Sequence, residues 1–175
     1  MPRYLALLRG INVGGRNKVS MTDLRDVAAA LGHADVVTYI QSGNLVFTSP
    51  DTDVARIADT LEAEVAVRLA VRPAVVVISG PDLAQVVRDN PFPAEENPKF
   101  LHAVFRRDVV DDEGIATVAA AVRQVREAGS LDDAAVVGRT LFLHTPDGLG
   151  RSALPPCSHA PKSSPPAPPA TGRRC

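Results

Sequence analysis

The sequence predicts an α+β fold in two successive units, followed by a tail of different composition. Three observations support this: short apolar runs typical of strands, longer amphipathic segments typical of helices, and an abrupt change of composition near residue 152. The chain has 175 residues, 45% hydrophobic and 22% charged, which allows one medium domain or two small ones. Aromatic residues make up only 4%, so the core must consist mainly of aliphatic side chains.

The first elements are a strand, a loop and a helix. Residues 3–9 are a short apolar run, which predicts a strand. Residues 10–19 contain three glycines, which oppose a helix and predict a loop. Ser20 is a typical N-cap, and Asp23 follows it as a variant of the capping box. Apolar residues at three-to-four spacing then predict a helix that ends at Gly32.

The next elements complete a recognisable order. Residues 36–41 and 45–49 are predicted strands, joined by a tight turn at Ser42-Gly43-Asn44. A helix over 51–69 and a buried strand over 73–79 follow. The order β-α-β-β-α-β is that of a ferredoxin-like plait, which we assign to residues 1–79.

A second, shorter series of elements occupies residues 80–151. It begins with a short helix over 81–88, and the elements after it read β-α-β-β, an incomplete plait-like unit without a final helix and strand. Their predicted bounds are 100–106, 112–127, 134–137 and 140–144, with the last two strands joined at Gly138-Arg139.

The tail from residue 152 to 175 does not match the body. Seven of the 15 prolines lie in it, and no acidic residue follows Asp147. Because proline opposes helices and central strands, the tail cannot join a packed core as a regular element. Two interpretations are open: a disordered proline-rich tail, or a frameshifted or truncated C-terminus of a GC-rich gene.

Polar and basic residues are expected to meet at one end of the first unit. In a plait, the loop after the first strand, the turn between the second and third strands and the connection before the fourth strand share one end of the sheet. The first 22 residues carry four basic side chains and no acid, on a chain of net charge −1. The predicted ligand-binding residues are Arg9, Asn12, Gly14, Gly15, Arg16, Asn17, Lys18, Gln41, Ser42 and Asn44, with Arg68 and Arg72 nearby.

These residue types suit an anion. Backbone N–H groups of a glycine-rich loop can converge on oxygen atoms, and a following helix N-terminus favours negative charge. Arginine binds phosphate or carboxylate through two parallel hydrogen bonds. The competing interpretation is that the glycines only turn the chain and the cations are only solvated. The segment matches neither common nucleotide-binding fingerprint.

Other chemistry has little support in the sequence. The N-terminus does not resemble a signal peptide, no run is long enough to span a membrane, and a cytoplasmic protein is expected. Both cysteines lie in the tail, so residues 1–150 hold no disulfide and no cysteine-based zinc site. His102 and His144 are expected in neighbouring strands, more as packing residues than as metal ligands. Tyr4 and Phe47 are expected to pack rather than to stack on RNA bases.

Three motifs resemble one known family. They are LLRGINVGGRNKVSMTDLR at 7–25, VTYIQSGNLVF at 37–47 and LFLHTPDGLGRS at 141–152, and together they are similar to a bacterial group of uncharacterised proteins, domain-of-unknown-function family sixteen ninety-seven. The resemblance implies an α+β fold of plait units and no activity. Its motif residues fall on the basic end described above. The resemblance stops near residue 152, where members continue with a helix and a tryptophan segment, which favours the frameshifted or truncated interpretation.

The resulting functional hypothesis is a binding module for a phosphorylated small molecule or an RNA or DNA backbone at the glycine-rich basic loop. The alternative is a structural or protein-interaction protein whose basic end contacts an acidic partner. Catalysis is left open, because Ser42 and Lys18 are the best titratable or nucleophilic candidates and neither has a recognisable catalytic partner. The sequence indicates no cofactor and no metal, and gives no oligomeric state.

Overall fold

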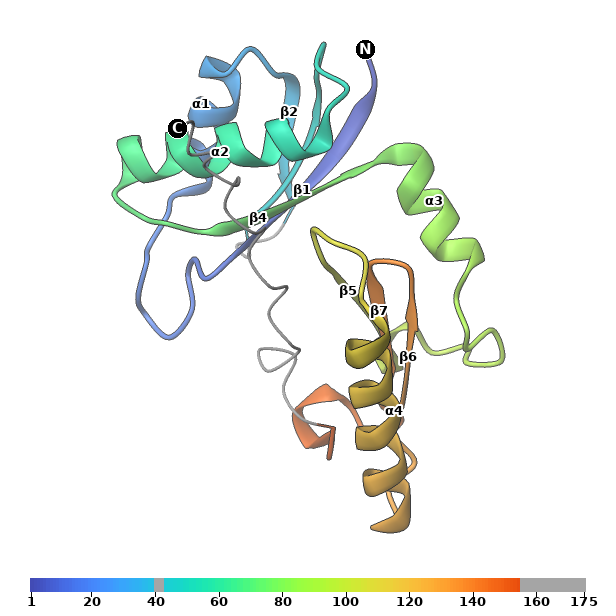
Figure 1. Cartoon of the computed structure of the whole chain (residues 1–175). Coiled ribbons are helices and arrows are strands. Elements are labelled where there is room, and N and C mark those ends of the chain that lie inside the picture. Colours follow the sequence, from blue (N-terminus) through green and yellow to red (C-terminus); the bar gives the residue numbers. More distant parts are fainter. Residues whose placement is uncertain (40–42, 155–175) are drawn as a thin grey trace, which may run out of the picture. The chain divides into compact units, whose positions relative to one another are not determined.

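The computed structural model describes residues 1–39 and 43–154. The chain divides into two compact units, Met1–Asn90 and Pro91–Cys175. Each is a mixed α+β unit with one antiparallel sheet. The first unit contains β1 (Arg3–Arg9), α1 (Met21–Ala30), β2 (Ala34–Tyr39), β3 (Asn44–Thr48), α2 (Val54–Leu69), β4 (Ala74–Ser79) and α3 (Gly80–Arg88) (Figure 1).

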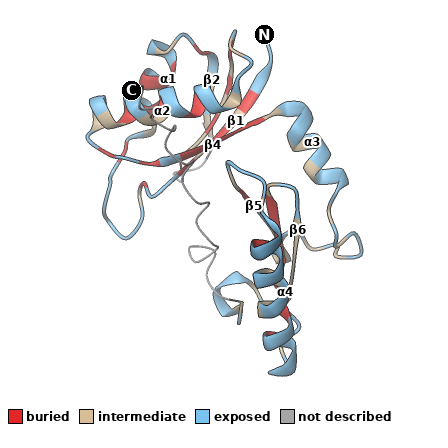
Figure 2. Cartoon of the chain, in the orientation of Figure 1, coloured by how far each residue is buried: buried red, intermediate tan, exposed pale blue. Residues whose placement is uncertain are grey.

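The sheet of the first unit has the order β2-β3-β1-β4, and every neighbouring pair is antiparallel. Because side chains alternate along a strand, Tyr4, Ala6 and Leu8 of β1 share one face, and all three are buried in the core. Figure 2 shows buried stretches along β1 and β4 and on α1. The two helices α1 and α2 cover this face, and they contribute apolar residues such as Leu24, Val27, Ile57 and Leu61 to the core.

Local side-chain contacts explain where the helices begin. As predicted, Ser20 is the N-cap of α1, and its hydroxyl accepts hydrogen bonds from the N–H groups of Thr22 and Asp23. Helix α2 begins at Val54 and not at the predicted residue 51. The reason is that Asp53 is its N-cap and accepts from the N–H groups of Ala55 and Arg56.

The predicted strands are present, with small shifts at their ends. The second strand was expected at 36–41 and lies at Ala34–Tyr39, with an irregular register between Ala34 and Val37. Gly43 has a φ of +84°, as a glycine in a tight turn can adopt. The predicted turn residue Ser42, and Gln41 before it, lie outside the described residues. Helix α3 contacts β4 and β1, so the first compact unit extends to Asn90 and not only to residue 79.

The second unit has the predicted β-α-β-β order. Its sheet order is β5-β7-β6, and both pairs are antiparallel. No described helix is long and apolar enough to cross a membrane. The elements are η1 (Pro98–Phe100), β5 (Leu101–Phe105), α4 (Asp112–Glu127), β6 (Asp133–Val137), β7 (Thr140–His144) and η2 (Leu149–Arg151).

Candidate functional site

The strand registers bring three polar segments of the first unit to one end of the sheet. Leu7 near the end of β1 pairs with Asn44 at the start of β3, and Arg9 pairs with Ala74 at the start of β4. The loop at 10–19, the turn before β3 and the connection before β4 therefore begin or end at the same edge. We call this edge the basic end of the sheet.

The loop after β1 contacts the turn before β3. The Leu8 N–H donates to the Gly43 carbonyl at 3.2 Å. Ile11 is 2% exposed, and a Cβ at Gly43 would lie 2.4 Å from Ile11 Cδ1 and 3.3 Å from Leu8 Cβ. Gly43 is therefore required both for its positive φ and for this close approach.

Two asparagines hold the loop in shape. The Asn12 side chain donates to the Val19 carbonyl at 3.0 Å and accepts from the Val19 N–H at 2.9 Å. The Asn17 side chain donates to the Gly10 carbonyl at 2.7 Å, and the backbone carbonyl of Asn17 accepts from the Asn12 N–H at 3.0 Å. Both residues have a left-handed φ near +50°, which asparagine tolerates. Their amides, predicted to bind a ligand, bind the loop's own backbone.

The tip of the loop is a tight turn. Val13 and Arg16 form an antiparallel bridge, and the Arg16 N–H donates to the Val13 carbonyl at 3.0 Å. Between them Gly14 and Gly15 have φ of +58° and +76°, the positive values at both central positions that type I′ turns require. The loop is a small hairpin arm that projects beyond the sheet (Figure 1).

Cations at the basic end differ in whether they are neutralised. Arg16 and Lys18 are exposed, and among the described residues their side chains take part in no hydrogen bond or ion pair. Arg9 and Arg72 are also exposed. Arg68 instead pairs with Glu64 one turn earlier on α2. Arg68, which was expected only near the predicted ligand-binding residues, therefore has an acidic neighbour of its own.

The N-terminus of α1 is also occupied. Two of its orphan N–H groups donate to the Ser20 hydroxyl, and the Asp23 carboxylate lies in the first turn. The predicted contribution of this helix end to anion binding is therefore weakened, because its donors and its dipole already have a local partner. The N–H groups of Gly14 and Gly15, at the tip of the loop, have no acceptor among the described residues.

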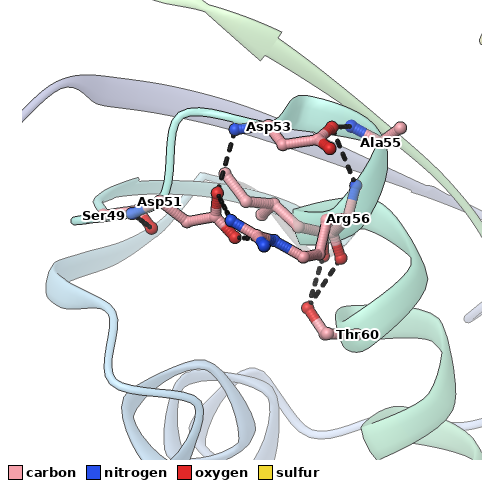
Figure 3. Close-up of polar contacts among 7 residues, drawn as sticks. Ser49, Asp51, Asp53, Ala55, Arg56 and Thr60 are labelled. Atoms are coloured by element: carbon pink, nitrogen blue, oxygen red, sulfur yellow. Dashed lines mark hydrogen bonds and ion pairs between the residues drawn. The ribbon is translucent and has the colours of Figure 1, made fainter.

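The opposite end of the sheet is acidic and internally paired. Arg56 donates from Nε to Asp51 Oδ2 and from Nη2 to Asp51 Oδ1, both at 2.6 Å (Figure 3). These hydrogen bonds, with one from the Asp53 N–H, lower the pKa of Asp51 to about 2. Asp53 and Asp82 lie beside the same end, each in the N-terminal cap or first turn of a helix.

The remaining predicted site residues have mixed placements. Asn44 lies at the basic end, and its side chain has no partner among the described residues. Gln41 and Ser42 lie outside the described part of the chain. The registers Leu101–His144 and His102–Leu143 place the two histidines on opposite faces of their sheet, and His144 Nε2 contacts Glu95 at 2.8 Å. Within residues 1–39 and 43–154, no three His, Cys, Asp or Glu side chains cluster to hold a metal ion.

Sequence reasoning passed over Val37 and Tyr39. They are 60% and 69% exposed on β2, an edge strand of the sheet. Both faces of this strand carry apolar residues, a pattern that is typical of a buried strand, so the sequence gives no signal that one face is open. Tyr4 and Phe47, the aromatics it did consider, are 4% and 0% exposed and belong to the core, as expected.

A mixed α+β unit with an exposed basic loop shows the architecture of the protein and does not by itself indicate a reaction. Residues 1–142 match the family model described as "Protein of unknown function (DUF1697)", and the chain belongs to this family. It is similar to the solved structure of the conserved bacterial protein SP0830 from Streptococcus pneumoniae, with 28% sequence identity and a TM-score of 0.61. The match covers 82% of this chain and 77% of that one. No curated protein matches the chain.

Proposed function

We propose that the first unit is a ferredoxin-like plait and that its basic arm binds the phosphate groups of a phosphorylated small molecule or of a nucleic-acid backbone. We define the basic arm as residues 10–19. The sheet order β2-β3-β1-β4, with α1 and α2 on one face, supports the assignment of the plait. The phosphate-binding groups in this proposal are the side chains of Arg9, Arg16 and Lys18 and the N–H groups of Gly14 and Gly15.

One observation carries the proposal: Arg16 and Lys18 form no ion pair with any described residue, and they lie on an arm whose shape is fixed by its own hydrogen bonds. An arginine on a flexible loop loses conformational freedom on binding, whereas a preorganised loop has already lost it. At the opposite end of the sheet, the Arg56 guanidinium already donates two hydrogen bonds to the Asp51 carboxylate. An incoming anion would therefore compete with a carboxylate at Arg56, whereas no described residue competes for Arg16.

Calorimetric titration with tripolyphosphate, a nucleoside triphosphate and a short oligonucleotide tests the proposal. The double variant Arg16→Ala/Lys18→Ala should weaken binding of all three about tenfold or more, since charge-assisted hydrogen bonds contribute roughly 1.5–3 kcal/mol each. The matched control is Arg88→Ala/Arg123→Ala, which removes the same charge from exposed positions on α3 and α4. If no anion binds the wild-type chain, or if both double variants weaken binding equally, the proposal is wrong.

The alternative, an acidic protein partner on the same arm, gives a different pattern. The exposed Val13 beside the turn, at 67%, would then contribute apolar contact to the partner. Val13→Ser would weaken such a complex and would leave tripolyphosphate affinity unchanged.

A further inference from the structure

One face of the sheet in the first unit carries an exposed aromatic ring next to the basic end. On β2, Val36 packs against the core, and Thr38 accepts a hydrogen bond from Arg25 Nη1 of α1 at 2.9 Å. Since side chains alternate along a strand, Val37 and Tyr39 point to the face away from α1 and α2. Tyr39 is 69% exposed, at the end of β2 that lies at the basic end.

The strand register places two further polar residues on the same face as Tyr39, on the neighbouring strands β3 and β1. Tyr39 pairs with Asn44 on β3, and Asn44 pairs with Leu7 on β1. Arg9 lies two residues beyond Leu7 and therefore on the same face. An aromatic ring, a carboxamide and a guanidinium thus follow one another along the edge from which the basic arm projects.

Building on the proposed phosphate-binding function, we propose that the ligand is a single-stranded nucleic acid whose base stacks on Tyr39 while its backbone runs along Arg9 and the basic arm. Proteins that hold single strands combine a basic track for phosphates with aromatic side chains for bases. The row at the basic end has both parts. The carboxamide of Asn44, which has no partner in the described part of the chain, lies between them and can donate to and accept from a base edge.

Charge and shape favour this occupant. The basic arm and the strand before it contain no acid, and the acidic side chains Asp51, Asp53 and Asp82 lie at the other end of the strands. A polyanion is therefore attracted to the basic arm. Tyr39 is open to solvent and so is the arm's tip, which fits an extended chain of nucleotides better than a small molecule that needs enclosure. A duplex keeps its bases stacked internally and cannot offer one to Tyr39.

Fluorescence anisotropy on the full chain tests the inference. The probes are fluorescein-labelled RNA and DNA single strands of about ten nucleotides and the corresponding DNA duplex. Tyr39→Leu should weaken single-strand binding about fivefold to a hundredfold, because it removes one stacking interaction. Tyr39→Phe should bind like the wild type, since it keeps the ring. Val67→Ala, at an 80% exposed position on α2, is the matched control and should have no effect.

The outcomes separate this inference from the proposed function. Tyr39→Leu should leave tripolyphosphate affinity unchanged, whereas Arg16→Ala/Lys18→Ala should weaken both tripolyphosphate and oligonucleotide. If Tyr39→Leu binds single strands as the wild type does, or if the wild type binds the duplex as tightly as the single strand, the inference is overturned. Neither result contradicts phosphate binding by the arm. If neither tripolyphosphate nor oligonucleotide binds, both proposals are wrong. Equal affinities for the RNA and DNA single strands would support recognition through phosphates and base stacking. A higher affinity for RNA would support these contacts and indicate a further one to the 2′-hydroxyl.

Discussion

At the scale of single residues, the basic end is shaped by backbone conformations that few side chains tolerate. Asn12 and Asn17 have left-handed φ and use their amides to close the arm, while Gly43 allows Ile11 to lie against the turn. These residues position the cations without offering a group to a ligand. Substitutions at these three positions should therefore change the stability of the first unit and the order of the arm, and should leave the charge of the arm unchanged.

Gly43→Ala should destabilise the first unit by about 2–4 kcal/mol. A left-handed φ costs a non-glycine residue roughly 1–2 kcal/mol, and the added Cβ would collide with Ile11 Cδ1. Gly14→Ala is the control, because it has a positive φ but open space around it, and it should cost only about 1–2 kcal/mol. Urea unfolding followed by circular dichroism measures both. Equal stability of the two variants would contradict the packing of Ile11 on Gly43.

His33 should make the first unit less stable in mild acid. The residue is 8% exposed, its ring stacks on Phe47 with a centroid distance of 4.5 Å, and neither ring nitrogen has a partner among the described residues. Burial lowers the pKa of His33 below 6.5, an effect that the charge of Asp51 partly offsets. The folded state therefore binds fewer protons than the unfolded state, and stability falls as pH decreases from about 6.5 towards the folded pKa.

The variant His33→Phe isolates this effect. It replaces the titrating ring with an apolar one, so the change in unfolding free energy between pH 7.5 and pH 5.5 should be smaller than in the wild type. Urea unfolding at both pH values checks this. The same pH dependence in both proteins would mean that another group is responsible.

At the scale of elements, the basic arm is ordered by Asn12, whose side chain makes two hydrogen bonds to Val19. Asn12→Ala should lower the free energy of unfolding by about 1–3 kcal/mol and speed hydrogen exchange at the Val19 amide. The reason is that both hydrogen bonds are lost and that alanine tolerates a left-handed φ less well than asparagine. Lys18→Ala should change neither the stability nor this exchange rate, since its side chain forms no hydrogen bond or ion pair with a described residue. Unchanged exchange at Val19 in Asn12→Ala would show that the arm is held in another way.

In the second unit, Asp132 fixes the last described residues. It is 3% exposed, and its Oδ2 accepts from the Ser152 hydroxyl at 2.8 Å and the Ala153 N–H at 2.7 Å. Asp132→Ala should therefore cost about 2–3 kcal/mol and speed hydrogen exchange at Ala153. Asp133→Asn is the matched control, because it breaks only a surface pair with Arg126 and should cost less than about 1 kcal/mol. Slow exchange at Ala153 in Asp132→Ala would refute this role.

The sequence predicted the order of the elements well and their contacts less well. Apolar periodicity, Ser20 and the glycine turns identify each element of the first unit to within a few residues. The sequence could not show that Asn12 and Asn17 bind their own backbone, because a carboxamide in a loop suits either role. It also could not show that Arg68 pairs with Glu64, or that Tyr39 lies on an open face, because both depend on the neighbours that folding supplies.

At the scale of the whole molecule, the two units have separate sheets, and the first has a core of its own. Every residue of its apolar cluster lies between Tyr4 and Val77. Residues 1–90 expressed alone should therefore unfold in one cooperative urea transition and retain tripolyphosphate binding. A fragment without a cooperative transition would show that the first unit depends on the second.

The basic arm is the feature on which the functional proposals depend, and its own amide signals test it most directly. In a ¹H–¹⁵N titration of the full chain with tripolyphosphate, the amides of Gly14, Gly15 and Arg16 should shift in a saturable way. The amides around Asp51 and Arg56, where the cation is already paired, should stay in place. Shifts that are absent from the arm, or equal in size at Arg56, would contradict phosphate binding at the basic end.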